Sequence, residues 1–158
     1  MQFKHMKAMF GAGCFWSVEE AFRIIPGVVS TEVGYAGGKG NNVNYEEVCS
    51  GDTGHAEAVL ITFNPKKISY SKLLEIFWGI HDPIQVNRQG PDVGYQYRSV
   101  IFYFDDSQKR DAEKSLKKEQ KKYGVPIATA IEKESTYCKA EEYHQKYIMK
   151  GGKASCHF

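Results

Sequence analysis

The sequence predicts an α+β protein: a two-layer sandwich with a ferredoxin-like (βαββαβ) core, extra helices and a long C-terminal tail. Two observations carry this prediction. Strand-like and helix-like hydrophobic periodicities follow one another in the order β-α-β-β-α-β-α-β-α. The 158 residues contain no internal repeat and no linker-like segment, and a chain of this length buries a sizeable core. We therefore expect residues 1–158 to form one domain.

The first half of the chain contains three predicted strands and one predicted helix. Apolar residues at positions 18, 21, 22 and 25 share one helical face, and Pro26-Gly27 stops that helix. Asn64-Pro65 is a turn signal that closes the third strand. The predicted elements are a strand at 7–11, a helix at 16–25, and strands at 28–35 and 55–63. Residues 37–42 are too polar and glycine-rich to be anything but a loop.

The second half begins with a helix that carries Leu73, Leu74 and Ile80, and Ser69 or Ser71 is its expected cap. Residues 81–96 form a long loop, and loops longer than about 12 residues in compact domains are usually functional or disordered. A capping box at 105–108 opens a helix that ends at Gly124. The remaining predictions are strands at 98–104 and 127–133, a last helix at 140–149, and a mobile tail at 150–158.

The composition excludes several classes of partner. The 21 Lys and Arg residues nearly balance the 19 Asp and Glu residues, which argues against nucleic acid or an anionic membrane as the main partner. No apolar stretch approaches about 18 residues, and the N-terminus lacks the apolar core of a signal peptide. We therefore expect a cytoplasmic protein.

The four cysteines do not form a metal-binding pattern. They stand at 14, 49, 138 and 156, and no two form a Cys-x-x-Cys pair. The pairs Cys49 with His55 and Cys138 with His144 do not have the spacing of paired zinc ligands. We expect no metal site.

Cys14 is the first candidate catalytic residue. It lies between a predicted strand and a predicted helix, in the segment Gly13-Cys14-Phe15-Trp16. Unsatisfied N–H groups and the positive end of the helix dipole stabilise a thiolate at such a position, and the thiolate is the reactive form of cysteine. A small buried cysteine that happens to precede a helix is the alternative, and this segment alone leaves both open.

Glu57 is the second candidate, because it lies within a strongly apolar strand. It shares a face with Val59, Ile61 and Phe63. A buried carboxyl without a cationic partner stays protonated near neutral pH, so it is able to donate a proton. An exposed glutamate at the end of the strand remains the alternative.

Four further residues are candidates for the site. Tyr45 and Tyr97 follow the glycine-rich loop and the long loop, and a phenol donates a hydrogen bond without carrying charge. Asp92 lies in a turn of the long loop. Cys156 lies in a glycine-flanked tail that is able to carry its thiol to a distant partner. A low-pKa thiolate with a mobile second thiol is typical of enzymes and sensors that pass through sulfenic acid to a disulfide.

Six motifs, taken together, resemble the A-type peptide methionine sulfoxide reductases over nearly the whole chain. Their combination in this order is highly specific. The motifs are Gly-Cys-Phe-Trp at 13–16, Gly-Tyr-Ala-Gly-Gly at 34–38, Tyr-Glu-Glu-Val-Cys-Ser-Gly-Asp-Thr-Gly-His-Ala-Glu at 45–57, Phe-Trp-Gly-Ile-His-Asp-Pro at 77–83, Gln-Tyr-Arg-Ser at 96–99 and Glu-Glu-Tyr-His-Gln at 141–145.

The resemblance implies reduction of the S epimer of methionine sulfoxide in proteins, and of the free amino acid. It implies that Cys14 is the nucleophile and that Glu57 is the acid that protonates the sulfoxide oxygen. The remaining roles that it implies fall on Tyr45 and Tyr97 as phenols that bind this oxygen, on Phe15 and Trp16 as the pocket for the S-methyl group, and on Asp92 as a supporting residue.

The resemblance also implies how the enzyme is recycled. Cys156 matches the resolving cysteine of the family only as a glycine-flanked tail cysteine. Some members have two tail cysteines and this chain has one, so a single disulfide step is implied, with thioredoxin as the reductant. No cofactor is needed, and we expect a monomer.

Two other functions compete with this prediction. A thiol hydrolase would use Cys14 as an acyl nucleophile and His55, His81 or His144 as the base. A thiol-based redox switch would use Cys14 and Cys156 without turning over a substrate.

Overall fold

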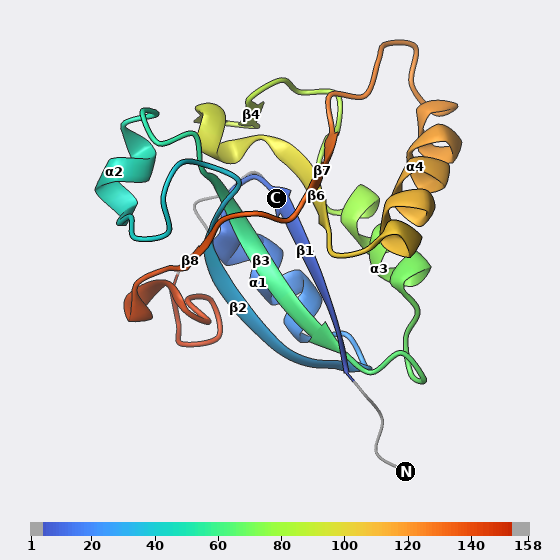
Figure 1. The fold of residues 1–158 in the computed structure, drawn as a ribbon, viewed down its shortest axis with the longest axis horizontal. Helices are drawn as coiled ribbons and strands as arrows, with labels where there is room; N and C mark the ends of the chain where they lie inside the picture. Colours follow the sequence, from blue (N-terminus) through green and yellow to red (C-terminus); the bar gives the residue numbers. More distant parts are fainter. Residues whose placement is uncertain (1–4, 153–158) are drawn as a thin grey trace.

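The computed structural model describes residues 5–152, and a six-stranded sheet lies at its centre (Figure 1). The sheet order is β7-β6-β1-β3-β2-β8, and a separate pair of short strands, β4 and β5, lies in the long loop. The strands are β1 (Met6–Ala12), β2 (Val28–Ala36), β3 (Ala56–Phe63), β4 (Arg88–Gln89), β5 (Asp92–Val93), β6 (Ser99–Tyr103), β7 (Ala130–Lys133) and β8 (Tyr137–Lys139). The helices are α1 (Phe15–Arg23), α2 (Tyr45–Cys49), α3 (Tyr70–Gly79) and α4 (Asp106–Gln120), with 3₁₀ turns at Tyr95–Tyr97 and Glu142–His144.

The four inner strands form the predicted ferredoxin-like core. Their order is β6-β1-β3-β2, and each neighbouring pair is antiparallel. Helix α1 connects β1 to β2 and α3 connects β3 to β6, so each helix crosses to a strand that is not adjacent to the preceding one. Strand β7 extends one edge parallel to β6, and β8 extends the other edge antiparallel to β2. The predicted fold class is therefore confirmed.

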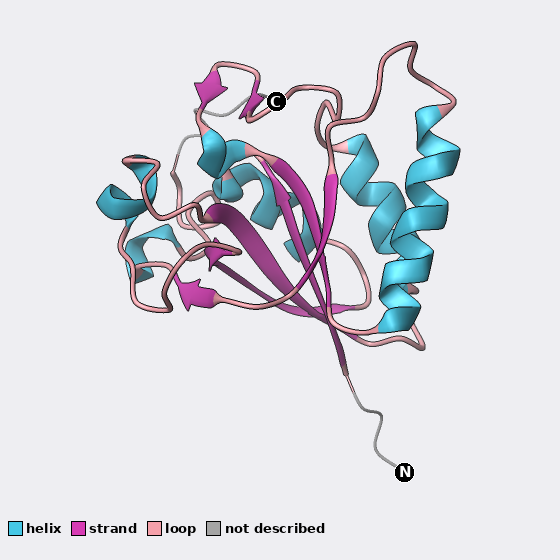
Figure 2. Ribbon diagram, turned by 45° about the horizontal axis from the view of Figure 1, so that its top comes forward, coloured by secondary structure: helices cyan, strands magenta, loops and turns pink. Residues whose placement is uncertain are grey.

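Helices α1, α3 and α4 cover one face of the sheet and form the second layer (Figures 1 and 2). Phe10 of β1 lies at the centre of this layer, with ring centroids 5.5 Å from Phe22 of α1 and 5.0 Å from Phe77 of α3. Helix α4 lies beside α3, where the Trp78 indole donates a 2.7 Å hydrogen bond to the Ser115 hydroxyl. A smaller apolar cluster around Met9, Val100 and Phe102 lies on the opposite face.

The alternation predicted for β3 is confirmed. The residues that pack with the helices include Val59, Ile61 and Phe63, whereas Ala56 and Ala58 belong to the cluster on the other face. Glu57 shares the parity of the first group, so its side chain lies on the helix-covered side and is 2% exposed. Glu57 is therefore a buried carboxyl and not an exposed glutamate at the end of the strand.

The prediction of a last helix at 140–149 is wrong. The segment forms only the 3₁₀ turn Glu142–His144 followed by hydrogen-bonded turns, and β8 precedes it. Lys146 has a φ of +52°, which interrupts a right-handed helix. The Gln145 side chain accepts a hydrogen bond from the Val33 N–H and donates one to the Val33 carbonyl, so this segment is attached to β2.

Several boundaries also differ from the prediction. Ser69 caps α3 as expected, and α4 ends at Gln120, before Gly124. The Asp105 side chain caps α4, but the Gln108 side chain accepts a hydrogen bond from the Phe104 N–H instead of completing a capping box. The complete capping box belongs to α2, a helix that was not predicted. It consists of Asn44 and Glu47.

No helix within residues 5–152 has both the length and the apolar character needed to cross a membrane.

Candidate active site

All seven predicted site residues that lie within the described part of the chain line one pocket of about 210 Å³. They come from five segments: the β1–α1 junction, α2, β3, β5 and the 3₁₀ turn that precedes β6. They are Cys14, Phe15, Trp16, Tyr45, Glu57, Asp92 and Tyr97. Cys156, the eighth predicted residue, lies outside the described residues.

Cys14 is the N-cap residue of α1 and is 7% exposed. Gly13 before it has a φ of +95°, a conformation that strongly favours glycine and turns the chain from β1 into the helix. Cys14 is disulfide-bonded, whereas Cys49 and Cys138 are free thiols. The residue that the sequence predicts as the nucleophile thus stands at a helix N-terminus and takes part in disulfide chemistry.

Glu57 is hydrogen-bonded to the residue that follows Cys14. Its Oε1 atom accepts a 3.1 Å hydrogen bond from the Phe15 N–H, the first residue of the helix. Burial raises the pKa of Glu57 to about 8, opposed by the Phe15 hydrogen bond and reinforced by the nearby Asp92. The carboxyl is therefore largely protonated at neutral pH and is able to act as an acid.

The two phenols of the pocket remain neutral. Burial raises the pKa of Tyr97 to about 12, with a further contribution from Glu57, and burial raises the pKa of Tyr45 still higher. Burial also raises the pKa of Asp92. Together with the protonated Glu57 carboxyl, the two phenols give the pocket three uncharged hydrogen-bond donors.

Phe15 and Trp16 form an aromatic wall that is held in place from behind. The Phe15 ring lies 5.7 Å from the Tyr35 ring. The Trp16 indole N–H donates a 2.9 Å hydrogen bond to Nδ1 of His144, and its ring stacks on Tyr147 with centroids 3.9 Å apart. The orientation of the indole is therefore set by the two residues of the C-terminal segment.

Comparison with known proteins identifies the family. A family model described as peptide methionine sulfoxide reductase matches residues 6–158. The chain belongs to this family. A peptide methionine sulfoxide reductase MsrA from Methanothermobacter thermautotrophicus is 55% identical over 156 residues, which cover 98% of this chain and 92% of that protein. One from Geobacter sulfurreducens is 56% identical over 152 residues, with 95% and 94% covered.

Solved structures of the family have the same fold. The reduced form of Mxr1 from Saccharomyces cerevisiae superposes with a TM-score of 0.92 at 36% identity, covering 99% of this chain and 94% of that one. Methionine sulfoxide reductase A of Corynebacterium diphtheriae gives a TM-score of 0.90 at 34% identity, covering 95% of this chain and 76% of that one.

Sequence reasoning missed Glu141, which supports the methionine sulfoxide reductase pocket from the C-terminal segment. Its two oxygens accept hydrogen bonds from the Tyr45 N–H, at 3.0 Å, and the Tyr35 hydroxyl, at 2.8 Å. Burial raises the pKa of Glu141, but these hydrogen bonds outweigh burial and lower it overall. The signal was present, because Glu141 and His144 both belong to a motif that resembles the family.

Cys49 is a further residue beside Tyr45 that sequence reasoning did not single out. It follows Tyr45 by one helical turn in α2, so both side chains lie on the same face of that helix. Burial raises the pKa of the Cys49 thiol, and the neighbouring Tyr45 hydroxyl opposes this shift. The i, i+4 spacing within the motif at 45–57 was the signal.

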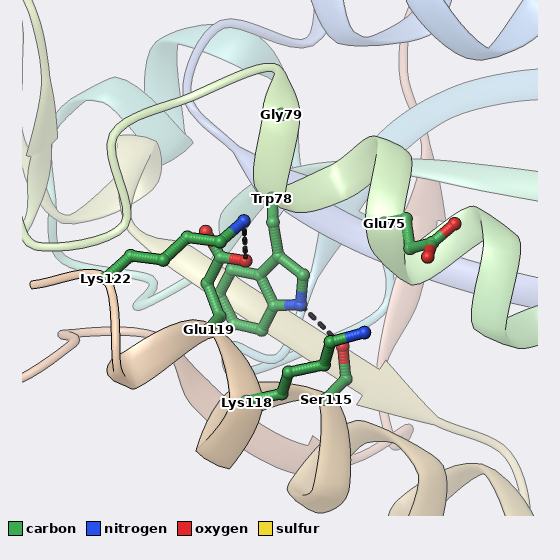
Figure 3. A pocket seen from close by; sticks show the side chains of 7 residues that line it. All are labelled: Glu75, Trp78, Gly79, Ser115, Lys118, Glu119 and Lys122. Atoms are coloured by element: carbon green, nitrogen blue, oxygen red, sulfur yellow. Dashed lines mark hydrogen bonds and ion pairs between the residues drawn. The ribbon is translucent and has the colours of Figure 1, made fainter.

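A second pocket, of about 250 Å³, lies between α3 and α4 (Figure 3). Trp78 and Ser115 form its floor, and an ion pair between Lys122 and Glu119 lies at its edge. None of its lining residues is a thiol or a predicted site residue. The chemistry of a reductase family therefore favours the smaller pocket at Cys14.

His55, His81 and His144, the three candidate bases of a thiol hydrolase, do not line the Cys14 pocket. Among the described residues that line the Cys14 pocket, none is a histidine. His55 donates to the Gly40 carbonyl, His81 bonds to the Phe77 carbonyl and the Ser99 hydroxyl, and His144 accepts from Trp16. Residues 5–152 also contain no cluster of three or more His, Cys, Asp or Glu side chains suited to a metal ion.

Proposed function

We propose that this chain reduces the S epimer of methionine sulfoxide, in peptides and proteins and as the free amino acid, with Cys14 as the nucleophile. The observation that carries the proposal is the convergence of a cysteine, a neutral carboxyl, two neutral phenols and an aromatic wall on one pocket. Membership in the peptide methionine sulfoxide reductase family supports it.

The first step transfers the oxygen atom from the substrate to the enzyme. The Cys14 sulfur attacks the sulfoxide sulfur while Glu57 donates its proton to the sulfoxide oxygen, which makes that sulfur a better electrophile. Rearrangement breaks the sulfur–oxygen bond of the substrate, releases methionine and leaves a sulfenic acid on Cys14. The Phe15 N–H occupies one oxygen of the Glu57 carboxyl, so the other oxygen is the one that carries the proton.

The remaining pocket residues orient the substrate. The hydroxyls of Tyr45 and Tyr97 donate to the sulfoxide oxygen and stabilise the negative charge that develops on it. Phe15 and Trp16 receive the S-methyl group, which needs an apolar surface. Asp92 supports the acid, because a carboxylate near Glu57 favours the protonated form of Glu57.

The second step regenerates the enzyme. The Cys156 thiol condenses with the Cys14 sulfenic acid, forming a disulfide and releasing water, and thioredoxin then reduces the disulfide. The support is that Cys14 is disulfide-bonded while Cys49 and Cys138 are free, and the sequence contains only one further cysteine. We also propose that the chain acts as a monomer and a single domain in the cytoplasm.

A direct test uses a synthetic peptide with one methionine sulfoxide, prepared as separate S and R epimers. With dithiothreitol as reductant, the S peptide should lose one oxygen by mass spectrometry and the R peptide should not. Cys14→Ser should abolish the loss, and Cys138→Ser, which removes a thiol outside the pocket, should retain it. A folded, reduced sample that turns over neither epimer would instead favour the redox switch.

The recycling step has its own test. Cys156→Ser should produce one equivalent of methionine and then stop with thioredoxin, but continue with dithiothreitol, because a small thiol reduces the sulfenic acid directly. Full cycling of this variant with thioredoxin would show that Cys156 is not the resolving cysteine.

A further inference from the structure

We propose that Tyr147 is a positioning residue for the disulfide-forming step: its ring, stacked on Trp16, contacts Gly152 at the start of the C-terminal tail, and so directs Cys156 toward Cys14. This inference rests on the proposed function, because it needs Cys156 to be the resolving cysteine.

Tyr147 connects the pocket wall to the tail. One side of its ring stacks on Trp16, with centroids 3.9 Å apart and planes inclined by 14°. Gly152 lies against the same ring, so closely that a Cβ atom there would overlap Cδ2, Cε2 and Cζ, with Cζ at 2.6 Å. The Gly152 N–H also donates a 2.9 Å hydrogen bond to the Tyr147 carbonyl.

The ring has little freedom to move away from Gly152. The Trp16 indole packs on one face of the Tyr147 ring and prevents the ring from moving in that direction. The indole is itself fixed by its hydrogen bond to His144. The residues just before Tyr147 are anchored as well. The Lys146 N–H donates a 2.7 Å hydrogen bond to Glu19, and Gln145 is attached to β2. The tail therefore departs from a fixed point on the wall of the catalytic pocket.

The length of the tail makes this point of departure important. Cys156 follows Gly152 by four residues, and an extended chain spans at most about 3.6 Å per residue, or roughly 14 Å in all. Such a short tether gives a high effective concentration of the thiol when its origin lies near the target, and almost none when it does not. Trp16 is only two residues from Cys14, so the origin lies near the target.

Tyr147 takes no part in the chemistry of the step. The Cys156 sulfur forms a bond to the Cys14 sulfur, the sulfur–oxygen bond of the sulfenic acid breaks, and the oxygen leaves as water with the proton of the Cys156 thiol. Gly152→Ala disturbs the Tyr147–Gly152 contact and keeps the Tyr147 ring on Trp16, so it should slow this step and leave oxygen transfer to Cys14 intact.

The experiment mixes reduced enzyme with excess S-epimer peptide, without reductant, and follows two quantities in quenched samples. The first is the first equivalent of methionine, which reports oxygen transfer. The second is the Cys14–Cys156 disulfide, which non-reducing peptide mapping reports. Gly152→Ala should slow the disulfide about tenfold or more, since small misplacements of reacting groups are costly, and should leave the first equivalent unchanged.

Four further variants separate positioning from general damage. Tyr147→Ala should also slow the disulfide, whereas Tyr147→Phe, which retains the ring, should behave as wild type. Adding Gly152→Ala to Tyr147→Ala should slow the disulfide no further, because both changes act through one contact. Gly124→Ala is the matched control, because a Cβ there meets nothing within 4 Å.

Two failures are distinguishable. A wild-type enzyme that releases methionine without a Cys14–Cys156 disulfide would overturn the resolving role of Cys156 and this inference with it. A wild-type enzyme that forms the disulfide, with Gly152→Ala and Tyr147→Ala forming it equally fast, would overturn only the positioning role of Tyr147.

Discussion

At the scale of single residues, the burial of Glu57 carries the proposed chemistry. The carboxyl is 2% exposed and has one backbone hydrogen bond, from Phe15. Desolvation therefore raises its pKa to about 8, about the value that an acid needs in order to be protonated at neutral pH and still give up its proton. The same carboxyl at an exposed strand end would be ionised and would have no proton to give.

The Glu57 pKa predicts how oxygen transfer depends on pH. The rate of the first turnover should fall above about pH 8, roughly tenfold per pH unit, because the ionised carboxyl has no proton to donate. Rapid-quench measurement of the first equivalent of methionine between pH 6 and 10 checks this. An alkaline limb that is unchanged in Glu57→Gln would assign it to another group.

Substitution at Glu57 tests the acid more directly. Glu57→Ala removes the donor and should slow the first turnover by about 10²–10⁴-fold, the usual contribution of general acid catalysis. Glu57→Gln retains an N–H donor and should lose less. Thermal melting of both variants serves as the folding control, and an unchanged first turnover in Glu57→Ala would contradict the role.

The sequence predicted the individual site residues better than their surroundings. Alternation in residues 55–63 placed Glu57 on the face of Val59 and Ile61, because strand parity is a local property. The grouping of Cys14 with Tyr45 and Tyr97 came from the family resemblance. The motifs marked Glu141 and Cys49 as notable, but the contacts of Glu141 with Tyr35 and Tyr45 were not predictable, because they depend on how distant segments meet.

At the scale of elements, residues 140–147 form a brace behind the pocket. The side chains of Glu141, His144 and Gln145 accept hydrogen bonds from the N–H of the first residue of α2, from the Trp16 indole and from the backbone of β2, respectively. These polar contacts explain why the segment is not the predicted helix. Side chains of this segment form hydrogen bonds with other elements, and the positive φ of Lys146 interrupts a right-handed helix. Helical periodicity alone does not reveal such competing partners.

Loss of the Glu141 hydrogen bonds should destabilise the fold. Glu141→Ala should cost about 1–2 kcal/mol at neutral pH, because charged hydrogen bonds are strong but this group is partly exposed. The pKa of Glu141 is lowered in the folded protein, so its contribution is present above the ordinary carboxyl pKa and is lost as the pH falls through the lowered folded value.

Urea unfolding at pH 7 and at pH 3 measures this difference. The gap between wild type and Glu141→Ala should shrink at the lower pH. The Glu134 carboxylate forms no hydrogen bond or ion pair within residues 5–152, so Glu134→Ala is a suitable control and should change the free energy of unfolding by less than about 0.5 kcal/mol.

At the scale of the whole molecule, a ferredoxin-like core carries the pocket at one end of its sheet. The periodicities of β1, β2, β3 and β6 predicted the core strands, because each is long and strongly patterned. The sheet order was not readable from the sequence, since it depends on which strand edges meet. The three-residue strand β8 was missed because so short a segment has no periodicity to detect.

Phe10 should be the residue on which the packing of the two layers depends most. It is fully buried and its ring contacts aromatic rings of both α1 and α3. Phe10→Ala should lower the free energy of unfolding by about 3–5 kcal/mol, as measured by urea denaturation. Val93→Ala, at a position that is 66% exposed, should change it by less than about 0.5 kcal/mol.

The central claim is that Cys14 takes the oxygen atom from methionine sulfoxide. The most direct measurement mixes the Cys156→Ser variant with one equivalent of S-epimer peptide and dimedone, which traps sulfenic acids, and maps the adduct by mass spectrometry. We predict one equivalent of methionine and one dimedone adduct, on Cys14. Methionine formed without an adduct on Cys14, or with the adduct on Cys49 or Cys138, would contradict it.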